Sequence, residues 1–262
     1  MKYEDRAGIE ECLAKKNYRV CESSYATYFL WDEKYKFEIC IKDGFLYTRF
    51  FEDGKYHYLS PMGEGDYIEA IEELCNYCSS QNERLSLAYV TEEDAGAIEN
   101  RFPDQFTVTP DRDSAEHLYL AERMITLQGK KLHSKRNFIN RFNKEYEGRW
   151  SFEKVRPEHL PELFEYENHW RRDNRTSEGD LESENVVIMK LLSNMDLLGA
   201  VGGLLRLDGR VIGFSLGTKI SGDTFDVQIE KADWEIPGAY QVLNNEFAKA
   251  FCSDVTYINR EE

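Results

Sequence analysis

A basic segment, residues 129–149, is the part of the sequence best suited to bind an anionic ligand. It holds seven Lys and Arg residues opposed only by Glu145 and Glu147, in a chain of 262 residues whose formal net charge is −16. Arg and Lys donate charge-assisted hydrogen bonds to phosphoryl oxygens, so the segment predicts a site for a nucleotide, a coenzyme or the acceptor end of a tRNA. The composition fits a solvated helix face equally well.

A second set of polar residues alternates along the predicted strand 224–230. Because side chains point to opposite faces in turn, Thr224, Asp226, Gln228 and Glu230 are expected on one face. A carboxylate there could deprotonate an attacking amine, with Glu230 as the first candidate for the base and Asp226 as the second. The same pattern also fits the solvent-facing side of an edge strand.

The segment that follows this strand leads into a predicted helix. Gly238 permits a close approach of the backbone, and free N–H groups at a helix start can hold a phosphate or a carboxylate. Lys231 adds a cation before the helix, and Tyr240 and Asn244 are four residues apart, so they share a face. The same residues also fit an ordinary loop followed by the first turn of a helix, with no ligand.

Other kinds of site find little support. The five His residues show no HxxxH or HExxH spacing, and Cys75 and Cys78 lie inside a helical pattern without a second pair, so no metal site is expected. The absence of G-x-S-x-G and GxxxxGK[ST] patterns disfavours hydrolase and P-loop functions.

The elements that would position these residues follow from hydrophobic periodicity and turn residues. In the first half we expect strands at 25–31, 36–41, 45–51 and 55–61, a helix at 66–80 and a strand at 85–90. The basic segment predicts a helix at 129–148. The second half predicts a strand at 150–155, helices near 157–172 and 181–197, strands at 200–208, 210–220 and 224–230, a helix at 238–252 and a strand at 254–258.

Three blocks carry a family resemblance: GKKLHSKRNFINRF (129–142), IEKADWEIPGAYQVLNNEFA (229–248) and YINREE (257–262). They resemble soluble relatives of the phosphatidylglycerol lysyltransferase C-terminal domain, a Fem-transferase-like family. The resemblance implies an α/β (α+β) fold of tandem GNAT-like acyltransferase domains, with mixed, mostly antiparallel sheets flanked by helices. The implied division is 1–128, a basic connecting helix at 129–148, and 149–262, the last truncated because the family normally continues with a further helix and strand.

The resemblance also implies an activity. Membrane-bound relatives move an aminoacyl group from aminoacyl-tRNA onto a lipid headgroup, so we expect transfer of an acyl, in particular an aminoacyl, group to an amine or hydroxyl acceptor. The donor would be aminoacyl-tRNA or an acyl-CoA. In that setting the binding residues are expected to be Lys130, Lys131, Lys135, Arg136, Asn137, Lys231, Gly238, Tyr240 and Asn244, with Glu230 and Asp226 as the catalytic candidates.

One departure from the GNAT pattern keeps an alternative open. GNAT enzymes cradle the cofactor pyrophosphate with a Q/R-x-x-G-x-G/A loop, but this sequence has DWEIPGAY, with one glycine. No cofactor is therefore assigned. The alternative is a non-catalytic binding module with a degenerate GNAT fold that holds a phosphorylated ligand or an RNA end, and a conventional acyl-CoA N-acetyltransferase is a further rival.

The N-terminal sequence lacks the basic and apolar regions of a signal peptide, and no apolar run approaches the ~20 residues that span a bilayer. We therefore expect a cytoplasmic protein without a membrane span. The sequence gives no indication of the oligomeric state.

Overall fold

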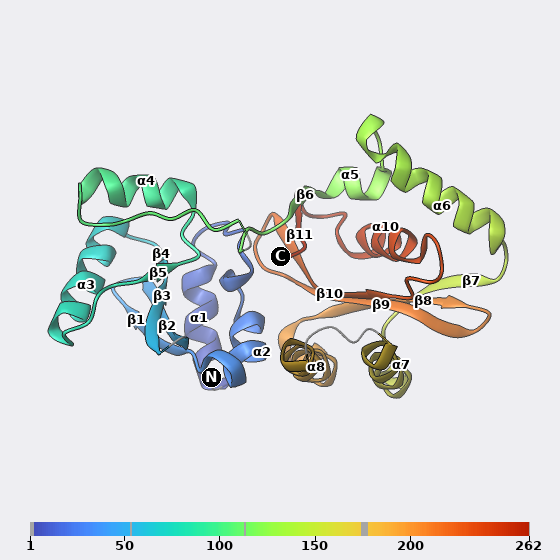
Figure 1. Ribbon diagram of the computed structural model, residues 1–262, viewed down its shortest axis with the longest axis horizontal. Coiled ribbons are helices and arrows are strands. Elements are labelled where there is room, and N and C mark those ends of the chain that lie inside the picture. The colour runs from blue at the N-terminus through green and yellow to red at the C-terminus, as the bar shows by residue number, and fades with distance from the viewer. Residues whose placement is uncertain (1–2, 53, 113, 174–177, 262) are drawn as a thin grey trace. The chain divides into compact units, whose positions relative to one another are not determined.

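The computed structural model describes residues 3–52, 54–112, 114–173 and 178–261. The chain divides into two compact units, Met1–Ala115 and Glu116–Glu261 (Figure 1). The unit boundary thus differs from the predicted division at residue 128, and the basic helix belongs to the second unit. In the described part of the chain, every helix is too short or too polar to cross a lipid bilayer.

The first unit is built around a small mixed sheet. Its strands run in the order β1-β2-β3-β5, with β4 paired to β2. The strands β1, β2 and β3 form an antiparallel meander, and β5 is parallel to β3. At the β1–β2 turn, Asp43 and Gly44 both have positive φ, as a tight hairpin turn requires. The elements are α1 (Arg6–Leu13), α2 (Tyr25–Tyr35), β1 (Glu38–Lys42), β2 (Phe45–Glu52), β3 (Lys55–Leu59), β4 (Met62–Gly63), α3 (Tyr67–Ser80), β5 (Leu87–Ala88) and α4 (Glu92–Arg101).

The predicted strand at 25–31 is wrong, because this segment forms α2. Its residues favour strands by type, but Ser24 caps the helix by accepting a hydrogen bond from the Ala26 N–H at 3.1 Å. Tyr25, Tyr28 and Leu30 are all buried. Burial on several sides of the helix outweighs the local preference of these residue types.

The second unit is a six-stranded sheet covered by helices on both faces. The strand order is β6-β11-β10-β9-β8-β7, and β10 and β11 are parallel. In Figure 1, α10, α5 and α6 lie on one face and α7 and α8 on the other. The elements are β6 (Leu118–Leu120), α5 (Ala121–Thr126), α6 (His133–Glu145), β7 (Trp150–Lys154), α7 (Leu160–Asp173), α8 (Glu178–Ser193), α9 (Met195–Leu198), β8 (Val201–Leu207), β9 (Arg210–Lys219), β10 (Thr224–Ala232), α10 (Ala239–Phe251) and β11 (Tyr257–Asn259).

The two units repeat one order of elements. Each has two helices, three antiparallel strands, a further helix and then a strand parallel to the third of the three. In the second unit a strand, β7, precedes this set, as the sequence predicts. The fold is therefore a tandem GNAT-like arrangement of mixed sheets flanked by helices.

A β-bulge in β10 decides which side chains face which helices. The pairing with β9 shifts by one residue between Asp226 and Ile229. Phe225 and Val227 pack against residues of α10 before the shift, and Glu230 bonds to α10 after it. Asp226 and Glu230 therefore lie on opposite faces, and the prediction that they share one is wrong.

Gly217, opposite this bulge, leaves no room for a side chain. A Cβ there would lie 2.1 Å from the Asp226 carbonyl oxygen and 2.6 Å from the Phe225 ring. We expect Gly217→Ala to lower the free energy of unfolding by about 1–3 kcal/mol, measured by urea denaturation. Gly96→Ala in α4, where nothing lies within 4 Å of the added Cβ, should instead stabilise the chain slightly. Unchanged stability of Gly217→Ala would contradict the close strand contact.

Candidate functional site

Glu230, near the carboxyl end of β10, is the centre of a buried polar network. Arg260 Nη2 donates a hydrogen bond to Glu230 Oε1 at 2.8 Å, and Asn244 Nδ2 donates to Oε2 at 3.0 Å. Only 9% of the Glu230 side chain is exposed. Burial raises the pKa of Glu230 above its ordinary value, although Arg260, Asn244 and the nearby charge of Lys135 oppose that rise.

The network lies where two parallel strands stop pairing. β11 pairs with β10 only from Thr224 to Asp226, and Glu230 lies four residues further along β10. Arg260 follows the last residue of β11 directly. The carboxyl ends of strands are the usual place for ligands in α/β sheets, so the position suits a reacting group.

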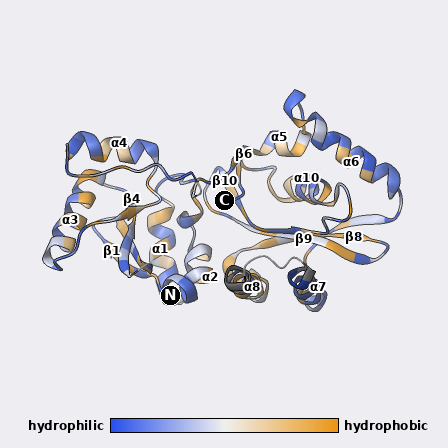
Figure 2. Cartoon of the chain, viewed as in Figure 1, coloured by the Kyte–Doolittle hydropathy of each residue, from blue (hydrophilic) through white to orange (hydrophobic). Residues whose placement is uncertain are grey.

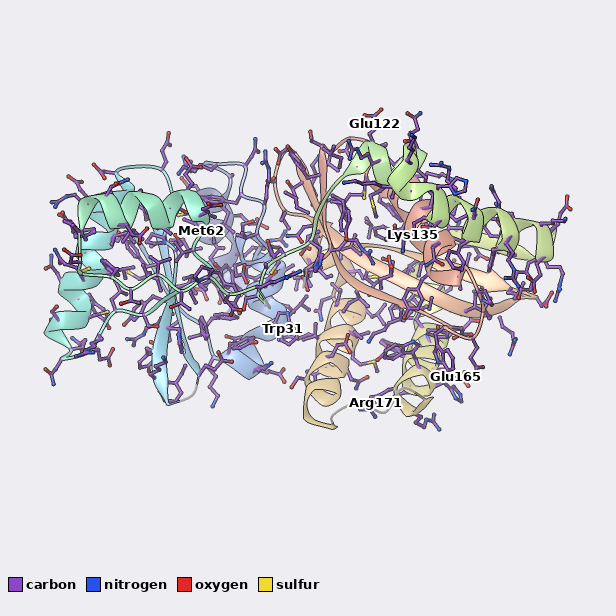
Figure 3. All side chains as sticks on the ribbon, turned by 45° about the horizontal axis from the view of Figure 1, so that its top comes forward. Trp31, Met62, Glu122, Lys135, Glu165 and Arg171 are labelled. Atoms are coloured by element: carbon purple, nitrogen blue, oxygen red, sulfur yellow. The ribbon has the colours of Figure 1, made fainter. Side chains whose placement is uncertain are left out.

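The basic helix α6 places one positive charge close enough to act on this network. Among the predicted basic residues, Lys135 is the one whose charge acts on Glu230. Figure 2 shows α6 as mostly hydrophilic, and Figure 3 places Lys135 on the α10 side of the second unit. Lys130 and Lys131 are exposed in a short 3₁₀ turn before the helix, so they remain available to phosphate groups.

Two other predicted binding residues are used within the fold. Arg136 Nη1 donates hydrogen bonds to the carbonyl oxygens of Leu127 and Gly129, the second at 3.0 Å. Asn137 Nδ2 lies 3.3 Å from His133 Nδ1, one helical turn earlier. These contacts stabilise the start of α6 and place neither side chain against Glu230.

The start of α10 shows the close backbone approach that the sequence predicts, but the partner is α6. Gly238 has φ +96°, and a Cβ there would lie 2.9 Å from the Phe138 carbonyl oxygen. Asn244 reaches Glu230, whereas Tyr240 is half-buried, with burial raising the pKa of its hydroxyl. The positive charges of Arg260 and Lys135 both act on Glu230 in this region.

Lys231 faces the opposite side of the sheet from Glu230. Its Nζ lies 2.7 Å from Glu184 Oε2 and 3.8 Å from the centre of the Trp170 ring. Both contacts are with α8 and α7, the layer that also holds the labelled Glu165 and Arg171 in Figure 3. The structure thus does not bring the predicted residues Lys231 and Asp226 together with Glu230.

Sequence reasoning missed Arg260 and the buried Glu167. Arg260 directly follows β11, which pairs in parallel with β10, and its place just after the last predicted strand was a usable signal. Glu167, in α7, is only 2% exposed, and burial raises its pKa to about 7. No sequence pattern marks Glu167, because its burial depends on how α7 and α8 pack over β10.

The high pKa of Glu167 predicts a stability that falls as pH rises. Its folded-state pKa lies above the ordinary value of 4.5, so the stabilisation is complete below about pH 4.5 and is lost as pH passes 7. The charged groups that act on it are Lys231, Glu184 and Arg171. Between pH 5 and pH 8 we expect a loss on the order of 2 kcal/mol from this group, measured by chemical denaturation.

Glu167→Gln, which resembles the protonated acid, should remove this part of the pH dependence. Glu165→Gln on the same helix is the control, because the Glu165 side chain is 76% exposed. Equal pH profiles for the parent and Glu167→Gln would show that Glu167 does not titrate in this range.

The comparisons with known proteins agree with this architecture. Residues 14–261 match the family described as phosphatidylglycerol lysyltransferase, C-terminal. A crystal structure of a conserved protein of unknown function from Bacteroides thetaiotaomicron is 31% identical, with a TM-score of 0.93 over 100% of this chain and 88% of that one. No curated protein matches the sequence.

Two more distant structures share the fold. L-PGS from Bacillus licheniformis is 17% identical, with a TM-score of 0.60, covering 88% of this chain and 71% of that one. FemX is 7% identical, with a TM-score of 0.60, covering 100% of this chain and 87% of that one. The family match extends over nearly the whole of this chain, and the structure has the tandem fold. The chain therefore belongs to the phosphatidylglycerol lysyltransferase C-terminal family.

Proposed function

We propose that this chain is an acyltransferase that moves an aminoacyl group from a tRNA to an amine or hydroxyl acceptor. The observation that carries the proposal is the buried Glu230 carboxylate, held by Asn244 and Arg260 beside the charge of Lys135. A carboxylate with a raised pKa is a better proton acceptor than an ordinary one. Membership of the family supports the same reaction class.

The proposed reaction needs no covalent enzyme intermediate. The acceptor nitrogen or oxygen attacks the ester carbonyl of the aminoacyl group, and its proton passes to Glu230. The ester C–O bond then breaks, the proton passes from Glu230 to the leaving tRNA ribose oxygen, and a new amide or ester bond remains on the acceptor. Arg260 and Lys135 would stabilise the negative charge that develops on the carbonyl oxygen.

The surroundings of α10 favour aminoacyl-tRNA over acyl-CoA as the donor. The turn before α10 has a single glycine, and Gly238 is packed against α6. A glycine-rich turn that could cradle a pyrophosphate is therefore missing from this position. The exposed Lys130 and Lys131 would instead contact tRNA phosphates, and a tRNA donor fits the cytoplasmic location that the sequence predicts.

A transfer assay tests this proposal. The purified chain is incubated with lysyl-tRNA carrying labelled lysine and with phosphatidylglycerol vesicles, the pair that the family name suggests, and in parallel with a panel of soluble amines. We expect protein-dependent movement of label from tRNA to an acceptor. Stabilisation against heat by acetyl-CoA, with no loss of label from any charged tRNA, would favour an N-acetyltransferase instead.

A second candidate is a binding module that holds a phosphorylated ligand or an RNA end without turning it over. Two observations favour it. Arg260 already donates a hydrogen bond to the Glu230 carboxylate, and Arg136 and Gly238 contact other parts of the protein. A tRNA acceptor-stem minihelix that binds in a salt-dependent manner, together with no transfer from any charged tRNA, would support this candidate.

A further inference from the structure

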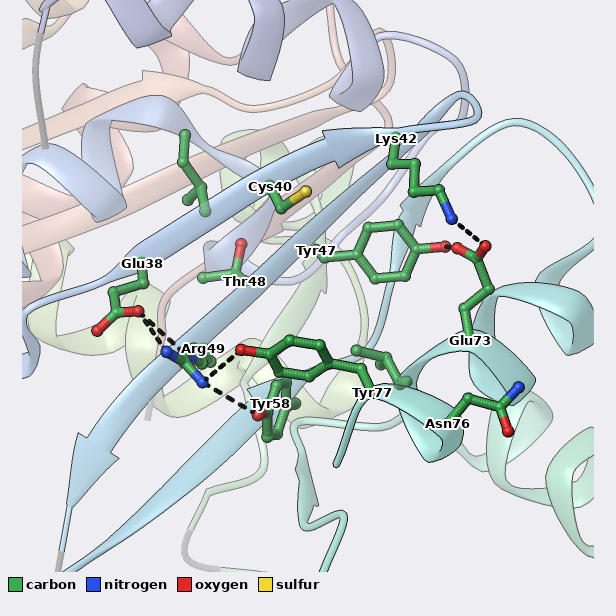
Figure 4. Close-up of a pocket in the computed structure, with 12 residues that line it drawn as sticks. Glu38, Cys40, Lys42, Tyr47, Thr48, Arg49, Tyr58, Glu73, Asn76 and Tyr77 are labelled. Atoms are coloured by element: carbon green, nitrogen blue, oxygen red, sulfur yellow. Dashed lines mark hydrogen bonds and ion pairs between the residues drawn. The ribbon is translucent and has the colours of Figure 1, made fainter. Parts of the chain in front are cut away.

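The first unit contains a pocket that the proposed transfer reaction does not use. It has a volume of about 500 Å³ and is lined by residues of β1, β2, β3 and α3 (Figure 4). A volume of this size suits a small molecule. Three tyrosines, Tyr47, Tyr58 and Tyr77, contribute to the lining, and an ion pair lies at each end.

Arg49 is the fixed member of the first ion pair. Its Nη1 donates to the hydroxyls of Tyr77 at 3.1 Å and Tyr58 at 3.4 Å, and its guanidinium lies 4.0 Å from the centre of the Tyr56 ring. Its remaining edge, Nε and Nη2, donates to a single oxygen of Glu38 at 3.0 and 2.7 Å. The Glu38 side chain is 53% exposed and that of Arg49 only 20%.

Glu38 therefore occupies the place that the carboxylate of a ligand would take on Arg49. Glu38 is the exposed partner of the pair, and its other hydrogen bond, accepted from the Tyr56 hydroxyl, is long at 3.3 Å, so Glu38 can turn towards solvent at small cost. Arg49 would keep its geometry, because the tyrosines hold it from the other side. This end of the pocket is a preformed site for an anionic group.

At the other end of the pocket the carboxylate is the more firmly held member of the ion pair, and the ammonium group is the more exposed one. Glu73 of α3 accepts hydrogen bonds from the Tyr47 hydroxyl at 3.1 Å and from Lys42 Nζ. Lys42 is the more exposed partner, at 54% against 38% for Glu73. An incoming ammonium group could replace Lys42 on the Glu73 carboxylate, which Tyr47 continues to hold.

We propose that this pocket binds a small zwitterion whose carboxylate meets Arg49, whose ammonium meets Glu73 and whose apolar body lies on the tyrosines. A short peptide has this chemistry, because its two terminal charges lie at opposite ends of the molecule, whereas those of a free amino acid are attached to one carbon. The net charge of the lining is zero, because its charged residues are Glu38, Lys42, Arg49 and Glu73. A nucleotide would leave the two carboxylates without a positive partner, and a polyamine would leave Arg49 and Lys42 without a negative one. The proposal is independent of the transfer reaction, which concerns the second unit.

Calorimetric titration of the full chain tests the ligand class. The probes are the dipeptide alanyl-phenylalanine, its N-acetyl form, its C-terminal amide and free phenylalanine. We expect the dipeptide to bind at least about tenfold more tightly than either blocked form, because each blocked form loses a charge-assisted contact. Free phenylalanine should bind more weakly than the dipeptide, because its two charges cannot reach both ends of the pocket, and equally tight binding would contradict the proposed two-ended recognition. Equal binding of blocked and unblocked dipeptides, or no saturable binding of any probe, overturns the proposal.

Variants at the Arg49 end separate recognition from structure. Arg49→Gln should weaken dipeptide binding about tenfold or more, whereas Glu38→Gln should strengthen it severalfold by removing the internal competitor. A merely structural ion pair would not shift affinity in opposite directions. Arg101→Gln is the matched control, because it removes an ion pair to Glu72 of α3 that does not line the pocket. If Arg49→Gln fails to fold, Glu38→Gln alone decides, and unchanged or weaker binding counts against the proposal.

Cys40 gives a direct report on where the probe binds. It lines the pocket, and of the six free cysteines it is the one that is exposed. Saturating dipeptide should slow its reaction with a maleimide about fivefold or more, since occupancy blocks access. An unchanged labelling rate at saturation would place the dipeptide elsewhere and overturn the assignment.

Discussion

Glu230→Gln is expected to slow aminoacyl transfer by about 10²–10⁴-fold, the usual contribution of a general base. Glutamine keeps the size of the side chain and can still accept a hydrogen bond from Asn244 or Arg260, but it cannot take a proton from the acceptor. The rate should be measured in a single turnover with labelled aminoacyl-tRNA, so that product release does not mask the chemical step.

The pH dependence provides a second readout for Glu230. Since burial raises its pKa, kcat/KM should rise with pH through a value above the ordinary 4.5 of a glutamate, and this limb should disappear in Glu230→Gln. Glu246→Gln, on the same helix as Asn244 and paired with Lys249 at 2.8 Å, is the control. A Glu230→Gln rate within threefold of the parent would exclude Glu230 as the base, while lost tRNA binding would indicate a binding role.

Phe142→Ala should destabilise the second unit by about 3–5 kcal/mol, the range for deleting a buried aromatic ring. Phe142 is fully buried, and its ring lies 4.9 Å from that of Tyr146 and 5.8 Å from that of Trp150. It belongs to the core cluster that includes Val242 and Leu243 of α10. Loss of this ring removes the main apolar contact that holds α6 on the unit.

Because α6 carries Lys135, the same variant should also lower transfer activity at temperatures where the chain remains folded. Phe138→Ala is the matched control, since Phe138 lies one turn earlier on α6 and its side chain is 44% exposed. Its effect on the free energy of unfolding should stay within about 0.5 kcal/mol. Equal effects of the two variants, measured by urea denaturation, would show that Phe142 does not anchor the helix.

From β7 to β11 the order of strands and main helices was predictable, because these elements carry their own periodicity and turn residues. Asp208 and Gly209, for example, both have positive φ and form the tight turn between β8 and β9 that the sequence indicates. The segment that forms α2 was not predictable in this way. Its tyrosines and Thr27 favour a strand locally, and only their burial within the first unit makes the helix the stable form.

The candidate site was predictable in part, and the limit is set by tertiary packing. The pairing of Glu230 with Asn244 fits a strand followed by a helix that crosses it. By contrast, the placement of Lys231 against Trp170 and the recruitment of Arg260 depend on contacts with residues far apart in the sequence. Simple alternation along the strand also failed, because it assumes that no extra residue interrupts the pairing.

That extra residue makes β10 tolerant of a change in length at one place. Removing one residue at position 227 or 228 would restore uniform alternation, and Asp226 and Glu230, then three positions apart, would still lie on opposite faces. Glu230 would keep its direction towards α10, and Lys231 its direction towards α7 and α8. A single codon deletion at the bulge would therefore leave the carboxylate and the ammonium on their present sides, whereas a deletion in a regularly paired strand turns every later side chain over.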